Sequence, residues 1–502
     1  MEGSQSRRPV SMLAAVRVVG IWKCGEYAAL AAFVIIVPRM MGPALYGRLA
    51  ALVSLMTLLV STSGLGTGAI FGRFLPEYSA TGDQLKARAL FIQLFWTRAV
   101  LALFLSIGLM VFLPRLIPGL SSLSFAIAGL ALLAGATAAT CFQVFYGSKQ
   151  FGKWSSQEPL TRATLLVLLL LLGGAHSLDR AIIAVALTNL VILGLGLFWS
   201  QDFFKTERAP IRWDTVWAHL RFGVTVFAGN LLLMTVWRLG ETAIVMLSGS
   251  SSEAAFFNIA NAAVMSANSL IILVFVMLIP VFTTLYVSGK QAAVEESMGR
   301  VLKLVTIAAF FAILAAYVAG PLVIERLLGQ RFAAVGANLR VLVLGLPATA
   351  LIALGAARGV ILQCPGKTMI TNGSALCTFI VAAFLLLPRM VSVGASIAVT
   401  LAMFTGAALA CYIFELTPVL RIARFGRLVL VCAISFAVLT LLPAPILISG
   451  IFSAALFVGL LFGTGVLQIA EVRAFVHGLK VQPENLPQSK SMEAPADEAS
   501  LL

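Results

Sequence analysis

The segment Ile-Trp-Lys-Cys-Gly-Glu-Tyr-Ala at residues 21–28 recurs 215 residues later as Val-Trp-Arg-Leu-Gly-Glu-Thr-Ala at residues 236–243. Both copies place an apolar residue, Trp, a basic residue, Gly, Glu and Ala at the same spacing, a match that chance rarely produces. Each copy lies in the first apolar run of one half of the sequence. The match predicts that the chain consists of two similar halves.

The apolar runs around these segments are long enough to cross a bilayer, which takes about 20 helical residues. Of the 502 residues, 60% are hydrophobic and 11% are charged, whereas soluble proteins carry about 25% charged residues. A soluble chain of this length cannot bury so much apolar surface. The composition excludes a soluble enzyme, a nucleic-acid-binding protein and a disordered scaffold. The net charge of +15 is typical of basic loops beside a membrane.

Fourteen apolar runs predict an all-α polytopic membrane protein with about 14 transmembrane helices, or twelve to thirteen if the short final pair is misassigned. The runs fall at residues 18–38, 49–72, 89–114, 122–146, 160–176, 181–199, 222–248, 254–285, 302–324, 338–362, 369–388, 394–415, 428–442 and 446–470. The predicted organisation is two six-helix lobes in parallel repeat plus two C-terminal helices. Its parts are a cytoplasmic N-tail (1–17), an N-lobe (18–199), a cytoplasmic interfacial linker helix (200–221), a C-lobe (222–415), helices 13 and 14 (416–470) and a disordered cytoplasmic tail (471–502).

The distribution of basic residues predicts the orientation. With both termini in the cytoplasm, and with charges at the membrane margins counted with the adjoining loops, 24 of the 35 Lys and Arg residues fall on the inner side, eight fall outside and three lie within spans. Such an excess on the inner side is typical of proteins of the cytoplasmic membrane. Six spans per half is an even number, so the two halves share one orientation. A transport site is then expected between them.

Away from the margins of the spans, five charged residues fall within the predicted spans, namely Lys23, Glu26, Arg98, Arg238 and Glu241. A charge at the centre of a bilayer costs roughly 2.5–3.5 kcal/mol, so these side chains should face a protein interior or a watery cavity. In one interpretation, the Lys23–Glu26 and Arg238–Glu241 neighbours pair locally and lock helix packing. This interpretation gives the charges a structural role.

A second interpretation gives the same charges a functional role. Lys23, Arg98 and Arg238 would line a substrate-binding cavity for an anionic head group, and Trp22 and Trp237 would contact sugar. Glu26 or Glu241 would couple transport to an ion, as a proton or sodium site. Because the five charges sum to +1, the attraction for an anion depends mainly on Arg98, which has no acidic neighbour in its span.

The sequence predicts no catalytic residue, metal site or cofactor. The six cysteines form no CxxC pair, which argues against a zinc site or a disulfide framework. Pro365-Gly-Lys-Thr368 is similar to the end of a phosphate-binding loop, but Ile361 stands where that loop needs glycine. We therefore do not expect an enzyme.

Several short segments carry a family resemblance. They are Met41–Gly47, Ser63–Gly66, Arg73–Glu77, Gly82-Asp83, Leu327–Phe332, Pro365–Lys367 and Val393–Ala398. Their order and spacing, over about residues 10–430, resemble the polysaccharide flippases of the multidrug/oligosaccharidyl-lipid/polysaccharide exporter superfamily.

This resemblance implies a flippase that moves a polyprenyl-diphosphate-linked oligosaccharide from the inner to the outer leaflet of a bacterial inner membrane. It implies alternating access between two rocking lobes, in the assembly of O-antigen or exopolysaccharide. The expected partners are the lipid-linked glycan and the bilayer, with a polysaccharide polymerase and glycosyltransferases as further candidates, and no nucleic acid.

Other functions fit the same features less well. A multidrug exporter of this fold would favour carboxylates without basic neighbours, whereas Glu26 has Lys23 beside it. A peptidoglycan-precursor flippase would be expected to have a more cationic cavity. A non-transporting scaffold has little reason to keep charges in its spans. A membrane glycosyltransferase would need a soluble segment with paired acids, which the sequence lacks.

Overall fold

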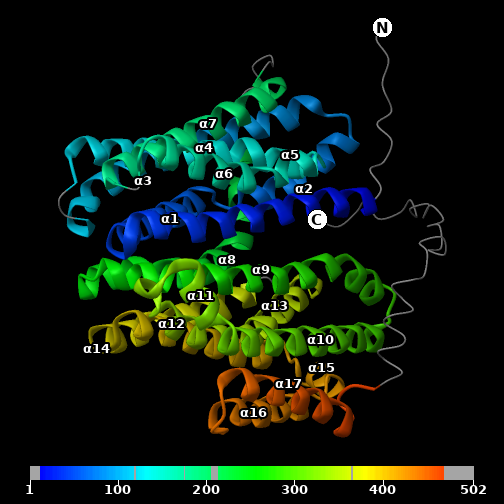
Figure 1. Ribbon diagram of the computed structural model, residues 1–502. Helices are drawn as coiled ribbons and strands as arrows, with labels where there is room; N and C mark the ends of the chain where they lie inside the picture. Colours follow the sequence, from blue (N-terminus) through cyan, green and yellow to red (C-terminus); the bar gives the residue numbers. More distant parts are fainter. Residues whose placement is uncertain are drawn as a thin grey trace. The chain divides into compact units, whose positions relative to one another are not determined.

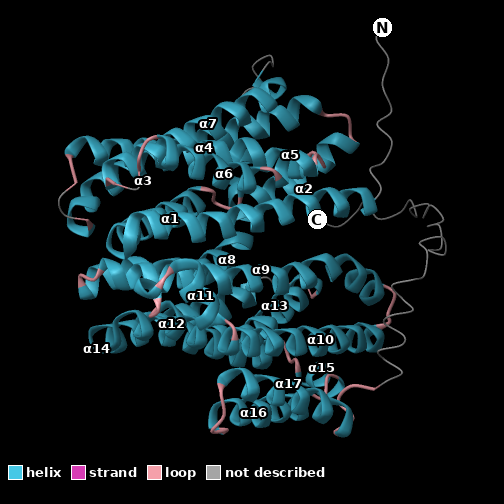
Figure 2. Ribbon diagram, in the orientation of Figure 1, coloured by secondary structure: helices cyan, strands magenta, loops and turns pink. Residues whose placement is uncertain are grey.

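The structure is a computed structural model that describes residues 12–117, 120–174, 176–204, 213–362, 364 and 366–468. In this part of the chain every regular element is a helix (Figure 2). The helices are α1 (Met12–Ser63), α2 (Thr67–Ala80), α3 (Gln84–Leu116), α4 (Ser122–Gly147), α5 (Phe151–Ser155), α6 (Gln157–Leu171), α7 (Leu178–Phe204), α8 (Trp213–Ser248), α9 (Ser251–Val287), α10 (Gln291–Val318), α11 (Gly320–Leu328), the 3₁₀ helix η1 (Gln330–Phe332), α12 (Val335–Val343), α13 (Leu346–Ile361), α14 (Gly366–Ile413), α15 (Thr417–Ile422), α16 (Phe425–Leu441) and α17 (Ile446–Gly463).

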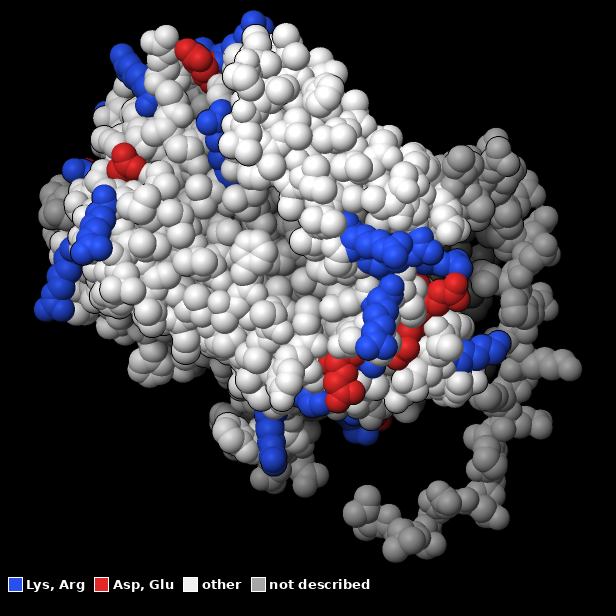
Figure 3. Space-filling model, turned by 90° about the horizontal axis from the view of Figure 1, so that it is seen from below, with Lys and Arg blue, Asp and Glu red and all other residues white. Residues whose placement is uncertain are grey.

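Many of these helices can cross a bilayer. Among the described residues, nine helical stretches are long and apolar enough, or ten if α12 and α13, which are bent by 43°, count as one span. Figure 3 shows a broad surface free of Lys, Arg, Asp and Glu, with charged side chains gathered toward its margins. The prediction of an all-α polytopic membrane protein is confirmed, whereas the count of fourteen spans stays a prediction.

Two of the nine stretches are too long for one crossing. The stretch Arg17–Ser79 has 63 residues and Gly366–Ile413 has 48, but about 20 helical residues span the hydrocarbon. α1 is interrupted at Gly42, where φ is 71°, and α14 at Val391, where φ is 44°. A Cβ added at Gly394 would lie 2.7 Å from the Leu386 carbonyl oxygen, so α14 folds back on itself. Each stretch therefore supplies two legs.

Aromatic residues build the core of the first lobe, which comprises α1 to α7. Phe71 of α2, Phe91 of α3 and Phe145 of α4 are buried together, and the rings of Phe71 and Phe91 stack with centroids 6.3 Å apart. Trp199 of α7 packs against the same cluster. The apolar faces of these helices are thus buried against one another.

Small residues bring the helices of the second lobe, α8 to α15, close together. A Cβ added at Gly355 of α13 would lie 2.9 Å from the Phe414 ring and 3.1 Å from the Ala410 Cβ. Small residues at such positions let membrane helices approach closely. The packing of α13 on α14 therefore depends on the absence of a side chain at Gly355.

The two lobes meet along α1, α8 and α9. Figure 1 shows α1 between the other helices of the first lobe and the pair α8 and α9, and α1 contacts both helices of that pair. At Gly47 the backbones approach so closely that an added Cβ would lie 1.7 Å from the Ser251 carbonyl oxygen of α9. At Gly66 an added Cβ would lie 2.1 Å from the Gly223 carbonyl oxygen of α8. We call the contact of α1 with α8 and α9 the interlobe seam.

The helices up to Ala423 form one compact unit, and Arg424 begins a second. In the second unit α16 and α17 form a hairpin in which Ser453 Oγ donates to the Ser435 carbonyl at 2.6 Å. Residues 205–212 of the predicted linker helix, the predicted tail at 471–502 and residues 1–11 lie outside the described residues. The rest of the predicted linker falls in α7 and α8.

Candidate functional site

The first copy of the repeat lies on the first leg of α1. Lys23 Nζ donates to Glu26 Oε2 at 2.6 Å, a pairing available to opposite charges three positions apart on a helix. Their side chains are 32% and 15% exposed, and Trp22 is half-buried. One residue further on, the Tyr27 hydroxyl lies 2.7 Å from the Ser269 hydroxyl of α9. This copy therefore lies beside the interlobe seam and stays partly accessible.

The second copy, on α8, is buried. Trp237 is 3% exposed and Glu241 is fully buried. Glu241 Oε1 accepts hydrogen bonds from Asn258 Nδ2 at 2.8 Å and from Asn261 Nδ2 at 3.5 Å. Glu241 Oε2, Arg238 Nε and Trp237 Nε1 are buried with no hydrogen-bond partner among the described residues. Since buried polar groups usually have partners, this copy holds unused hydrogen-bonding capacity.

Two further charges join the second copy from α6. Glu158 and Arg162 lie four residues apart, with 3.6 Å between Oε2 and Nη2. Both act electrostatically on Arg238, and Arg162 also acts on Tyr46. Sequence analysis missed them because the orientation tally counted Arg162 with an inner loop. Their i,i+4 spacing at a helix start was the signal that could have found them.

A chain of hydrogen bonds crosses the interlobe seam at the second copy. Tyr46 Oη, on the second leg of α1, donates to Asn258 Oδ1 of α9 at 2.8 Å. Asn258 Nδ2 in turn donates to Glu241 of α8. Asn258 and Asn261 also escaped sequence analysis, because a search for charges passes over amides. An amide pair inside the apolar run 254–285 was the available signal.

Arg98 lies apart from both copies. It is 3% exposed, and Nη2 donates to the Val60 carbonyl at 2.8 Å. Nη1 donates to Gln143 Oε1 at 3.1 Å and Nε to Ser63 Oγ at 3.3 Å. These partners belong to α1 and α4, so in this structure the guanidinium is bound within its own lobe, where α1 ends.

The repeated glycines differ as much as the charges do. A Cβ added at Gly240 would lie 2.4 Å from the Phe257 ring of α9, whereas the nearest atom to one at Gly25 is Pro159 Cβ at 3.9 Å. Gly240 thus permits close packing inside the second lobe, and Gly25 has room around it. The repeat therefore has one buried, tightly packed copy and one partly exposed copy.

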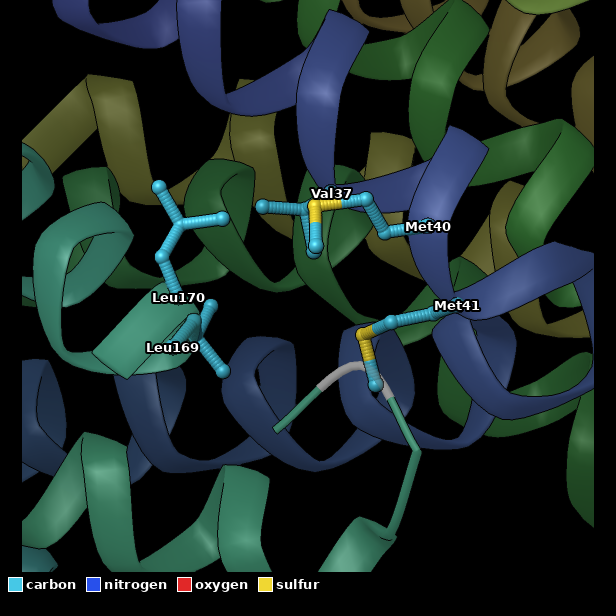
Figure 4. Close-up of a pocket in the computed structure, with 5 residues that line it drawn as sticks. All are labelled: Val37, Met40, Met41, Leu169 and Leu170. Carbon is cyan, nitrogen blue, oxygen red and sulfur yellow. The ribbon is translucent and has the colours of Figure 1, made fainter. Parts of the chain in front are cut away.

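A small apolar pocket lies between the first leg of α1 and the end of α6. Figure 4 shows its lining side chains, Val37, Met40, Met41, Leu169 and Leu170, and its cavity volume is about 10 Å³. Ligand pockets usually measure about 300–1,000 Å³, so this one is too small and too apolar for a sugar. Within the described ranges no three His, Cys, Asp or Glu side chains are placed to hold a metal ion.

Aromatic rings join the start of α8 to α2. His219 is 5% exposed, its ring centroid lies 4.4 Å from that of Phe74, and Nε2 lies 3.2 Å from the Tyr78 hydroxyl. Arg73 lies over the Phe222 ring at 4.8 Å. Burial lowers the pKa of His219 below its ordinary value, against a smaller opposite effect of Glu77. The folded protein therefore favours the neutral imidazole.

Acid should weaken this contact between α2 and α8. In the unfolded chain the pKa of His219 is about 6.5, and in the folded protein it is lower. The neutral imidazole therefore contributes fully to stability above about pH 6.5, and this contribution is lost as the pH falls further. We expect the thermal unfolding midpoint of wild type to decrease as the pH is lowered from about 7 to about 5, and that of His219→Phe to decrease less steeply. His176→Phe, at an exposed histidine, should keep the wild-type slope. Equal slopes in wild type and His219→Phe would contradict this account.

The sequence model of a family described as polysaccharide biosynthesis protein matches residues 23–286, which include residues 23–28 of the first copy of the repeat and the whole of the second copy. No curated protein matches the sequence. Among solved structures, the lipid II flippase MurJ in an inward closed conformation is similar to this chain with a TM-score of 0.65 at 11% identity, over 93% of this chain and 100% of that one.

Two multidrug resistance transporters of the MATE family, within the MOP superfamily, are also similar. The inward-facing one has a TM-score of 0.61 at 15% identity, over 82% of this chain and 99% of its own. The outward-facing one has a TM-score of 0.54 at 16% identity, over 82% and 96%. At such identities the likeness establishes a common fold.

Proposed function

Because the chain belongs to the family of polysaccharide biosynthesis proteins, we propose that it is a flippase for a polyprenyl-diphosphate-linked oligosaccharide. It would move this substrate from the inner to the outer leaflet of a bacterial inner membrane, with both chain termini in the cytoplasm. It would make and break no covalent bond. Glycosyltransferases would act on the same glycan before it, and a polysaccharide polymerase would act after it.

One observation carries the proposal: the two copies of the repeat place their charges along the interlobe seam, one partly exposed and one buried. A diphosphate crosses hydrocarbon extremely slowly, because burying an unpaired ion costs many kcal/mol. Cations placed between two lobes lower that cost if the lobes open alternately toward each leaflet. In the proposed mechanism, such cations and such motion would coincide at the seam.

The partly exposed residues of the first copy and the more buried residues of the second copy would have different roles. Lys23 is held by Glu26 in a partly exposed pair, and such pairs contribute only about 0–1 kcal/mol, so a phosphate can displace Glu26 at small cost. Arg238, with Arg162 beyond it, would stabilise the phosphate as the lobes close. Trp22 and Trp237 would contact sugar rings. Glu26 or Glu241 would bind the coupling proton or sodium ion.

Arg98 would serve this mechanism as a positioning residue. Its hydrogen bonds to Val60 and Ser63 hold the second leg of α1 at the point where the helix ends before Gly64. That leg carries Tyr46 and Gly47 to the seam. Arg98 thus fixes one wall of the seam.

Removing the partly buried cation Arg238 should slow flipping. In vesicles that contain the purified protein and a polyprenyl-diphosphate-linked oligosaccharide, Arg238→Ala should lower the flipping rate about 10- to 100-fold. The reason is that a hydrogen bond to a charged group contributes about 1.5–3 kcal/mol. The rate is followed by a glycosidase that cleaves only outward-facing glycan. Arg238→Lys, which keeps the charge, should retain most of the rate.

The same vesicles separate the competing functions. Gly25→Ala, at a glycine of the same repeat with room for a methyl group, should flip at the wild-type rate. If wild type leaves the glycan as one-sided as empty vesicles do, the proposal fails. Export of a cationic dye would then favour a multidrug exporter, and flipping of a peptidoglycan precursor would favour that substrate.

A further inference from the structure

The hydrogen-bond chain across the interlobe seam has a fixed polarity. Tyr46 of the first lobe is 2% exposed and donates to Asn258 Oδ1, while Asn258 Nδ2 donates to Glu241, each at 2.8 Å. An ionised carboxylate only accepts hydrogen bonds. Glu241 therefore turns the amide donors toward itself, which leaves Oδ1 to receive the Tyr46 hydroxyl. Ionised Glu241 thus orients one of the groups that link the two lobes.

We propose that Asn258 is a positioning residue that transmits the charge of Glu241 to the contact between the lobes. This inference rests on the proposed function in one respect, that a flippase must separate its lobes to work. While Glu241 is ionised, the chain through Asn258 holds α1 on α9. When Glu241 binds a proton, the chain weakens and the seam opens.

The site offers a place for that proton. Glu241 Oε2 is buried and has no hydrogen-bond partner among the described residues. A proton from solvent can therefore bind Oε2 while Oε1 still accepts from Asn258. The bond from Asn258 then changes from a charge-assisted to a neutral one, and charge-assisted bonds are roughly twice as strong. Because linked hydrogen bonds polarise one another, the bond from Tyr46 weakens as well.

The surroundings of Glu241 fit a group that changes charge. Arg238 lies on the same helix and Tyr46 of α1 interacts with Glu241 electrostatically, while Arg162 of α6 acts on both Arg238 and Tyr46. From α9 it meets the neutral amides of Asn258 and Asn261. Glu158 partly balances Arg162, so the charge of this cluster depends on the state of Glu241.

The test measures the separation of the lobes without any substrate. Spin labels are placed on Ser122→Cys, at the start of α4, and Ala333→Cys, which follows η1, after replacement of the six native cysteines. Both positions are exposed. The full-length protein is held in nanodiscs of phosphatidylethanolamine and phosphatidylglycerol. Pulsed electron paramagnetic resonance gives the distance distribution between the labels from about pH 9 to about pH 5, a range wide enough to include the titration of a buried carboxyl group.

In wild type, acid should raise the ratio of long to short distances about tenfold, as expected when a charged hydrogen bond becomes neutral. Glu241→Gln, Asn258→Ala and Tyr46→Phe should each show the long distances at every pH. Asn268→Ala, a buried amide on the same helix outside the chain, should keep the wild-type response. Tyr46→Phe and Glu241→Gln are nearly isosteric, so misfolding of Asn258→Ala would not remove the test.

A pH response that survives in Glu241→Gln, or short distances at high pH in Tyr46→Phe, would overturn the proposal. Glycan flipping is measured separately. If the protein shows the pH response but flips no glycan, this inference holds and the proposed substrate is rejected. If the protein flips glycan without the pH response, the proposed substrate holds and this inference is rejected.

Discussion

Replacing Gly47 by alanine should hold the two lobes apart and slow flipping about tenfold or more. The added Cβ would lie 1.7 Å from the Ser251 carbonyl oxygen, so α1 and α9 cannot keep their present distance. Overpacking of this kind costs about 1–3 kcal/mol, and the two backbones can relieve it only by separating. The clash is between lobes, so each lobe should still fold. The spin labels at positions 122 and 333 should report long distances at every pH.

Gly25→Ala is the matched control for this change, because it adds the same methyl group to the same helix. Its nearest neighbour would be Pro159 Cβ at 3.9 Å, which is ordinary contact. It should leave both the distances and the flipping rate as in wild type. If Gly47→Ala shows wild-type distances and rate, the close approach of α1 and α9 is not part of the working cycle.

Arg98→Ala should destabilise the first lobe by about 3 kcal/mol or more. The change removes three hydrogen bonds that the guanidinium donates, to the Val60 carbonyl, the Ser63 hydroxyl and the Gln143 amide oxygen. Ser63 Oγ still donates to the Val60 carbonyl at 2.7 Å. Each hydrogen bond to a charged group contributes about 1.5–3 kcal/mol. The loss is measured as a shift in the free energy of unfolding of the purified protein in detergent.

Lys23→Ala provides the contrast, because Lys23 is 32% exposed and paired only with its helical neighbour Glu26. It should cost less than about 1 kcal/mol of stability and yet reduce flipping. Should Arg98→Ala keep full stability and lose only flipping, then Arg98 contacts substrate, as the sequence interpretation had it, and does not act through α1.

The sequence indicated which charges lie within apolar segments, but it did not predict which groups surround them in the fold. Counting charges in apolar runs found Arg98, but its partners are uncharged groups from distant segments, and no local pattern links Val60 or Gln143 to it. The same limit applies to Asn258 and Asn261, whose importance comes from Glu241 on a neighbouring helix. A repeat in the sequence indicated two equivalent sites, whereas tertiary packing gave them opposite environments.

Helix breaks were predicted better where the residue type requires one. Gly42-Pro43 indicated a turn, and α1 is interrupted at Gly42 with φ of 71°, a conformation that glycine adopts without strain. In α14 the gap between the apolar runs 369–388 and 394–415 predicted a break near residues 388–394. The interruption falls at Val391, a residue that rarely adopts a positive φ, so its position is decided by the packing of the two legs.

The unequal burial of the two repeat copies has an evolutionary consequence. A half-length ancestor with one such segment would have associated with a second copy of itself about a twofold axis, and symmetry would have given both segments the same surroundings. Joining two halves in one chain removes that requirement. In this chain the Lys23–Glu26 pair is partly exposed, whereas Glu241 accepts a hydrogen bond from an amide of α9. A motif that occurs twice in one chain is thus free to take two different roles.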